Sequence, residues 1–338
     1  RCIMNTVKVL FFGSTTDSVI VLQKLGAIKA CSIAAVVTQP AKPIGRDHII
    51  TATPVEVWAK QHNTACLSFE NNPEKPWLYA DAQQVIDALQ PIGADLLVSA
   101  SYGIKIPWDT IRATKFGGIN IHPSILPHWR GADPVPWAIL SGDHQIGVSV
   151  VTLSETFDQG IILAQEKIPI TPKDTSDPLR TKLFTKGADL LAKILPDYIT
   201  GDIKRKLKTS PQPLASHLGG VKLYARKFTR EDGFESWDVV SAATTAGTDA
   251  ERVERKFRAL HPWPGVWTLL RQGYGGQTTD NDKRLKILKL HLDNGKLVLD
   301  QVQLEGKKPV YIVNLLQLMP SLSKELRSSL PPNLEHFQ

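Results

Sequence analysis

Apolar residues in the first part of the chain alternate between strand-like runs and helical spacing. The run Val7–Phe12 ends at Gly13-Ser14, which predicts a buried strand followed by a turn. Residues 17–25 carry apolar side chains at helical spacing, and residues 33–37 form a second strand-like run. A strand, a helix and a strand in this order predict a parallel sheet.

The same patterns extend the α/β arrangement and then change character after residue 203. We expect helices starting at Thr53-Pro54 and at 81–89, 135–140 and 177–195, strands at 94–100 and 119–122, a long connection at 39–52, and an edge hairpin from 148–153 and 161–168. Further on, a helix at 250–260 precedes three or four strands separated by polar turns. This second part predicts a small β-barrel.

Composition and charge support two globular parts with different partners. The 338 residues suffice for about two domains, and 42% hydrophobic with 22% charged residues excludes disorder as the dominant state. Residues 1–204 hold 19 basic and 19 acidic residues, whereas residues 205–338 hold 21 and 14. The whole net charge of +7 therefore lies in the last part, which favours an anionic partner there.

Several protein classes are excluded by what the sequence lacks. No apolar run approaches the ~18–20 residues that a membrane span needs. Neither a P-loop motif nor a dinucleotide-binding fingerprint is present. The three cysteines lie in no metal-binding or disulfide pattern, so we expect reduced thiols, no metal site, no membrane contact and a cytoplasmic protein.

Candidate chemistry lies at the end of the strand predicted at 119–122. Asn120 and His122 are two residues apart, so their side chains share one face, at the carboxyl end where open α/β sheets bind ligands. An amide and an imidazole can both donate to an oxygen that gains negative charge during acyl transfer. Asp158 lies in a turn and could orient or deprotonate His122. A purely structural role for these polar groups stays open at this point.

Residues 118–134 resemble the signature of the 10-formyltetrahydrofolate-dependent formyltransferases, and Asp158-Gln159-Gly160 stands where that family has Asp-x-Gly. The resemblance implies that Asn120, His122 and Asp158 are catalytic. It also implies that 10-formyltetrahydrofolate is the formyl donor and that no metal takes part. The folate pocket would be lined by four consecutive residues, Ser124, Ile125, Leu126 and Pro127.

Segments outside the signature resemble the branch of this family that acts on initiator methionyl-tRNA in translation initiation. They are 7–13, 38–46, 224–227, 258–265 and 302–309, so the resemblance spans about residues 7–316. It implies a Rossmann-like catalytic domain at 1–203, a basic linker at 204–220 and an OB-like tRNA-binding domain at 221–338. It also implies that Lys42 and Arg46 contact the tRNA acceptor end. We expect a monomer in a bacterial cytoplasm, an organellar matrix being the other possibility.

The basic residues of the second part could form a track for the tRNA backbone. They are Lys204, Arg205, Lys206, Lys208, Lys227, Arg230, Lys307 and Lys308. The alternative for each of them is a solvated surface position. Four positions depart from the family pattern: Asp47, Asp133, Gln159 and Ile161. None of the four removes a proposed catalytic group.

Two other functions remain possible on the sequence. One is a formyltransferase that acts on a small amine, such as an amino-sugar nucleotide, with the same three side chains. Such enzymes need no basic β domain, so the C-terminal resemblance counts against it. The other is a noncatalytic RNA-binding protein on a formyltransferase scaffold, against which the presence of Asn120, His122 and Asp158 counts.

Overall fold

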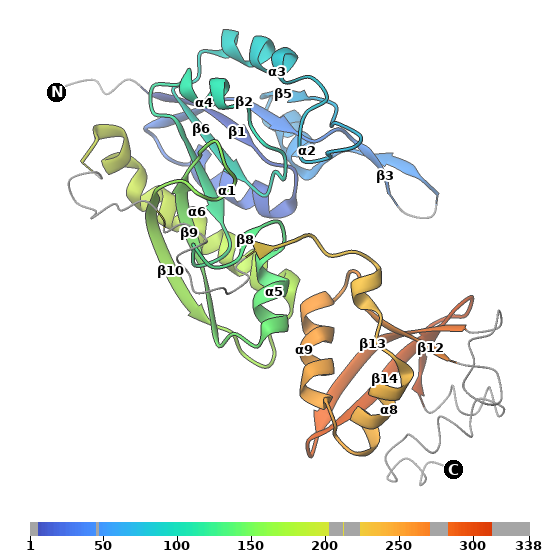
Figure 1. Ribbon diagram of the computed structural model, residues 1–338. Coiled ribbons are helices and arrows are strands. Elements are labelled where there is room, and N and C mark those ends of the chain that lie inside the picture. The colour runs from blue at the N-terminus through green and yellow to red at the C-terminus, as the bar shows by residue number, and fades with distance from the viewer. Residues whose placement is uncertain (1–5, 45–46, 203–211, 213–223, 271–282, 313–338) are drawn as a thin grey trace. The chain divides into compact units, whose positions relative to one another are not determined.

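A computed structural model describes residues 6–44, 47–202, 212, 224–270 and 283–312 (Figure 1). Within them the chain forms two compact units. The first comprises the described residues within 1–134, 145–169 and 178–226, and the second comprises those within 135–144, 170–177 and 227–338. The boundaries predicted at 203 and 220 lie in or beside residues outside the described part, so that division stays a proposal.

The first unit is built on a seven-stranded sheet in the order β10-β9-β7-β6-β1-β2-β5 (Figure 1). Its parallel strands are β1 (Val7–Phe12), β2 (Cys31–Thr38), β5 (Ala65–Ser68), β6 (Leu96–Ala100) and β7 (Gly118–His122). The antiparallel strands β9 (Gln145–Thr152) and β10 (Ile162–Pro169) form the predicted hairpin at one edge. The prediction of a mostly parallel α/β domain is confirmed.

Helices cover both faces of this sheet. They are α1 (Thr16–Gly26), α2 (Pro54–Gln61), α3 (Ala82–Leu89), α4 (Trp108–Arg112) and α6 (Ser176–Thr200). Leu10 and Phe12 of β1 share a core with residues of α3 and α4. On β7 and β9, Ile121 and Val148 lie against Gly187 of α6, where a larger side chain would collide with them.

Two sequence predictions in this unit need correction. The segment 39–52 is more than a connection, because it contains a two-stranded hairpin, β3 (Lys42–Ile44) with β4 (Ile49–Thr51). The last helix of the unit continues past residue 195 to Thr200 with Pro196 inside it. Both differences arise where Pro and Gly mask the periodic pattern that the prediction used.

The second unit holds a four-stranded antiparallel sheet in the order β12-β13-β14-β15. The strands are β12 (Val266–Leu270), β13 (Lys283–Asp293), β14 (Lys296–Leu304) and β15 (Val310–Tyr311), with helices α8 (Trp237–Thr245) and α9 (Ala250–Leu260) packed on their apolar face. Asn294-Gly295, both at positive φ, joins β13 to β14 as the predicted tight turn. The small β domain is confirmed; its closure into an OB-like barrel stays a prediction.

Two short segments that precede residue 178 belong to the second unit. One contains most of α5 (Pro134–Ser141), in which the ring of Trp137 stacks on Phe228 with 4.8 Å between centroids. The other contains Ser176, whose hydroxyl donates to the carbonyl of Ala259 at the end of α9. The second unit is therefore assembled from three stretches of chain.

Among the helices of the described residues, none is long and apolar enough to cross a bilayer. In the same part of the chain, no three His, Cys, Asp or Glu side chains come together as ligands of a metal ion.

A buried ion pair joins α1 to α6, and its loss should destabilise the first unit. The Asp17 carboxylate is 1% exposed and accepts from Arg180 Nε at 2.6 Å and from Thr181 Oγ1 at 2.8 Å. Because the Arg180 side chain is 36% exposed, water offsets part of the loss, and we expect Asp17→Ala to lower the free energy of unfolding by about 1–3 kcal/mol. Urea denaturation measures this.

The matched control is Lys24→Ala, which removes the pair between Lys24 and Asp189, both about half exposed. We expect it to stay within ~0.5 kcal/mol of the wild type. Equal losses in the two variants would contradict a special role for the buried pair.

Candidate active site

Three polar side chains meet at the carboxyl end of β7. Asn120 Nδ2 and His122 Nδ1 each lie 3.5 Å from Asp158 Oδ1. The side chains of His122 and Asp158 are only 5% and 9% exposed. The structure thus brings together the three groups that the spacing and the resemblance single out, and their role in catalysis remains a prediction.

The position of Asp158 is set by the backbone around it. Asp158 adopts φ 56°, a left-handed conformation that turns the chain between β9 and β10. Two residues later, a Cβ on Gly160 would stand 1.8 Å from the carbonyl oxygen of Thr152, so only glycine fits there. Asp158 Oδ2 accepts from the amide of Gly131 at 2.9 Å. The buried carboxylate therefore has a fixed direction and a hydrogen-bond donor.

The two ring nitrogens of His122 have different hydrogen-bonding partners. Nε2 lies 2.8 Å from the carbonyl oxygen of Trp129. A carbonyl only accepts, so Nε2 carries a proton and Nδ1 faces Asp158. At 3.5 Å this second contact is longer than a normal hydrogen bond. Nδ1 is therefore the ring nitrogen that can exchange a proton with the carboxylate or with a bound substrate.

The segment Ser124–Pro127 begins two residues after the end of β7 and is held by hydrogen bonds from β9 and β10. The amide of Leu126 donates to Ser149 Oγ at 3.1 Å, and Ser149 Oγ donates to the carbonyl of Ser124 at 2.6 Å. Gln165 Nε2 donates to the carbonyl of Leu126 at 2.9 Å. These bonds fix the backbone of the segment.

The four predicted folate-pocket residues form two pairs that differ in solvent exposure. Ser124 and Leu126 are buried at 0% and 2% exposure, and the Ser124 hydroxyl donates to the carbonyl of His128. Ile125 and Pro127 are half-buried and keep apolar surface accessible. We conclude that only the second pair can touch a ligand with its side chains, and that the first pair shapes the segment from within.

The predicted RNA-contacting residues are only partly within the described chain. Arg46, Lys204, Arg205, Lys206 and Lys208 lie outside it. Lys42 is exposed on β3 and donates to Gln39 Oε1 at 3.0 Å. In the second unit Lys227, Arg230, Lys307 and Lys308 are exposed. Their contact with RNA stays a prediction.

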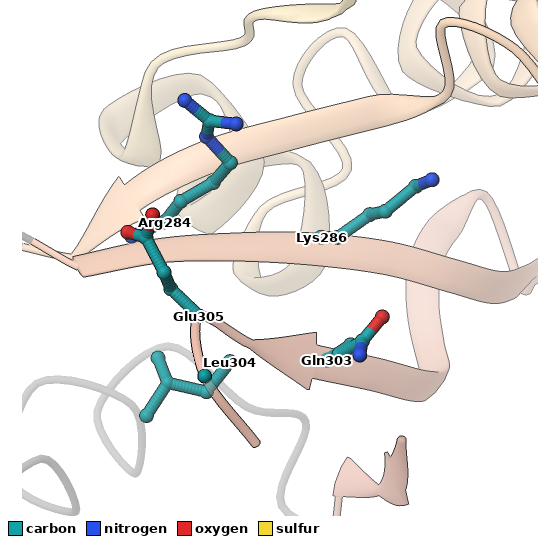
Figure 2. Close-up of a pocket in the computed structure, with 6 residues that line it drawn as sticks. Arg284, Lys286, Gln303, Leu304 and Glu305 are labelled. Carbon is teal, nitrogen blue, oxygen red and sulfur yellow. The ribbon is translucent and has the colours of Figure 1, made fainter. Parts of the chain in front are cut away.

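The sequence analysis missed a basic hollow of about 180 Å³ on the sheet of the second unit (Figure 2). Its two cationic side chains, Arg284 and Lys286, come from β13. The remaining lining residues include one carboxylate and are Gln303, Leu304, Glu305 and Gly306. Figure 2 shows Arg284 and Lys286 extending from the same strand. The Arg284 guanidinium also lies 4.6 Å from the ring centre of Trp267. The alternation of 284–287 between basic and apolar residues was the signal, because a period of two puts Arg284 and Lys286 on the outer face.

Comparison with known proteins identifies the family. Residues 7–195 match the family described as formyl transferase, and residues 247–296 match the formyl transferase C-terminal domain. A methionyl-tRNA formyltransferase of Ehrlichia chaffeensis is 33% identical over 329 residues, which cover 90% of this chain and 95% of the relative. One from Roseiflexus castenholzii is 32% identical and covers 90% and 94%.

Solved structures share the fold at lower identity. A 4-N formyltransferase from Francisella tularensis has a TM-score of 0.55 at 16% identity and covers 80% of this chain and 95% of that one. HypX from Aquifex aeolicus in complex with tetrahydrofolic acid has a TM-score of 0.52 at 16% identity, covering 92% and 47%. The matches along the sequence show that the chain belongs to the formyl transferase family.

Proposed function

We propose that this protein transfers the formyl group of 10-formyltetrahydrofolate to the α-amino group of methionine on initiator tRNA, and so serves translation initiation. The observation that carries the chemistry is the meeting of Asn120, His122 and Asp158 at the carboxyl end of β7. The proposal places the reaction in a bacterial cytoplasm and takes the protein to act as a monomer.

The segment after β7 fits the folate donor. A pterin ring needs apolar contact on its faces and backbone partners along its edge. Ile125 and Pro127 offer half-buried apolar surface, and the bonds from Ser149 and Gln165 hold the backbone between them still. Bound there, the donor would hold its activated formyl carbon near His122, because the segment begins two residues after His122 in the chain.

Asn120, His122 and Asp158 each have a separate role in the proposed reaction. Asn120 Nδ2 is a donor for the formyl oxygen, which gains negative charge as the amine attacks. His122 Nδ1, once protonated, is a second donor at the same side of the site. The attacking amine must be neutral and then loses a further proton. The Asp158 carboxylate, which lies 3.5 Å from His122 Nδ1, can accept that proton directly or through a water molecule and return it to the leaving nitrogen.

Three features support tRNA, rather than a small amine, as the acceptor. The relatives named methionyl-tRNA formyltransferase match along nine-tenths of the chain, including the second unit. The β3–β4 hairpin extends away from the seven-stranded sheet (Figure 1) and carries the exposed residues Ile49 and Ile50. The basic hollow around Arg284 and Lys286 offers donors for phosphate oxygens beside an aromatic ring.

A direct assay tests the acceptor. Purified protein with 10-formyltetrahydrofolate receives methionyl-tRNA in one reaction and an amino-sugar nucleotide or free methionine in the others. We expect the formyl group to appear only on methionyl-tRNA. Transfer to the small amines at equal rates would contradict the proposal, as would the absence of any transfer.

Removing either oxyanion donor should slow the reaction without preventing substrate binding. We expect His122→Ala and Asn120→Ala each to lower kcat by ~10²–10³, because each removes a donor that acts in the transition state. Steady-state kinetics measure kcat, and fluorescence titration measures folate binding. The control His144→Ala changes an exposed histidine at the start of β9 and should leave both unchanged. Near-normal turnover of His122→Ala would contradict the assignment.

The basic hollow should contribute to RNA affinity through charge. We expect the double variant Arg284→Gln/Lys286→Gln to bind methionyl-tRNA more weakly and to reduce the slope of log Kd against log salt by about 1–2. Filter binding at several salt concentrations measures both. The control Lys193→Gln changes an exposed lysine of α6 and should keep the wild-type slope. Equal slopes in all three proteins would exclude the hollow from the RNA-binding surface.

A further inference from the structure

Gln212 belongs to the stretch predicted as a linker, yet it is buried at 9% exposure. Its amide uses all of its hydrogen-bonding capacity. Oε1 accepts from Arg130 Nη2 at 2.7 Å and from Arg130 Nε at 3.2 Å. Nε2 donates to the carbonyls of Asp158 at 2.9 Å and Gly160 at 2.8 Å. The network fixes which way the amide faces, since the opposite orientation would set donors against the guanidinium.

These bonds act on the loop that carries the candidate catalytic carboxylate. The carbonyls of Asp158 and Gly160 lie in a strained turn, where buried acceptors need donors. On the other side, Arg130 is 7% exposed, and its chain neighbour Gly131 donates to Asp158 Oδ2. Burial lowers the pKa of the Arg130 guanidinium, and the charge of Asp158 opposes that shift. Asp158 is thus held through its side chain by Gly131 and through its backbone by Gln212.

We propose that Gln212 is a positioning residue for the reaction: it ties Arg130 to the Asp158–Gly160 turn and so keeps the Asp158 carboxylate in register with Asn120 and His122. The inference rests on the proposed function. If so, Gln212, although it lies in the predicted linker 204–220, helps to hold the candidate active site in shape. A displacement of the carboxylate by even 1 Å can cost up to ~10²-fold in rate.

The variant Gln212→Glu removes the hydrogen-bond donor of Gln212 and tests that part of the network alone. It keeps an acceptor for Arg130 but sets a carboxylate oxygen against the carbonyls of Asp158 and Gly160. We expect kcat to fall about 10- to 100-fold while KM for methionyl-tRNA and for 10-formyltetrahydrofolate changes less than about threefold. Gln212→Met fills the same space without hydrogen bonds. It should likewise lower kcat while leaving both KM values nearly unchanged.

The control Gln84→Glu makes the same chemical change at an exposed position in the first turn of α3 and should behave as the wild type. If wild type and control transfer no formyl group to methionyl-tRNA, the proposed function fails. If they do and both Gln212 variants keep kcat within twofold, this inference alone fails. It is also overturned if kcat falls only together with a matching rise in KM and a drop in melting temperature, because that pattern indicates a general structural role.

Discussion

The candidate site depends on one buried carboxylate. A carboxylate that is 9% exposed needs hydrogen-bond donors, and the neighbours of Asp158 come from separate parts of the chain. The backbone amide of Gly131 donates to Oδ2, while the Asn120 amide and the His122 ring each lie 3.5 Å from Oδ1. Each of these groups is in turn fixed by a strand or by a further hydrogen bond. The end of β7, the short strand β8 (Arg130–Gly131) and the β9–β10 turn are therefore arranged around a single group.

The elements that position this group were accessible from the sequence because their signals are local. Val7–Phe12 is an apolar run broken only by Lys8, and Asn120 and His122 share a face through the two-residue period of a strand. The distance from Asn120 and His122 to Asp158 was not accessible from periodicity, since 35 residues of intervening chain separate His122 from Asp158. The turn position of Asp158 suggested that pairing, and the family resemblance supported it.

Gln212 shows why the rest could not be predicted. Its sequence surroundings, Ser210-Pro211-Gln212-Pro213, are typical of an exposed linker. Its burial arises only when distant strands present a guanidinium and two carbonyls at the right separation. Likewise, the hairpin β3–β4 was hidden in a stretch whose Pro and Gly content is typical of a loop. Tertiary contacts determine both, and no local pattern records them.

The interleaved composition of the two units has a consequence for how the protein can be divided. The chain passes from one unit to the other five times, at 134/135, 144/145, 169/170, 177/178 and 226/227. A single cut in the predicted linker would separate residues 135–144 from the C-terminal part of the second unit. The buried side chains of Val135 and Ile139 would then remain on the N-terminal fragment, without the rest of their unit. Neither unit is a single continuous segment of chain, so neither can be removed intact by one cut.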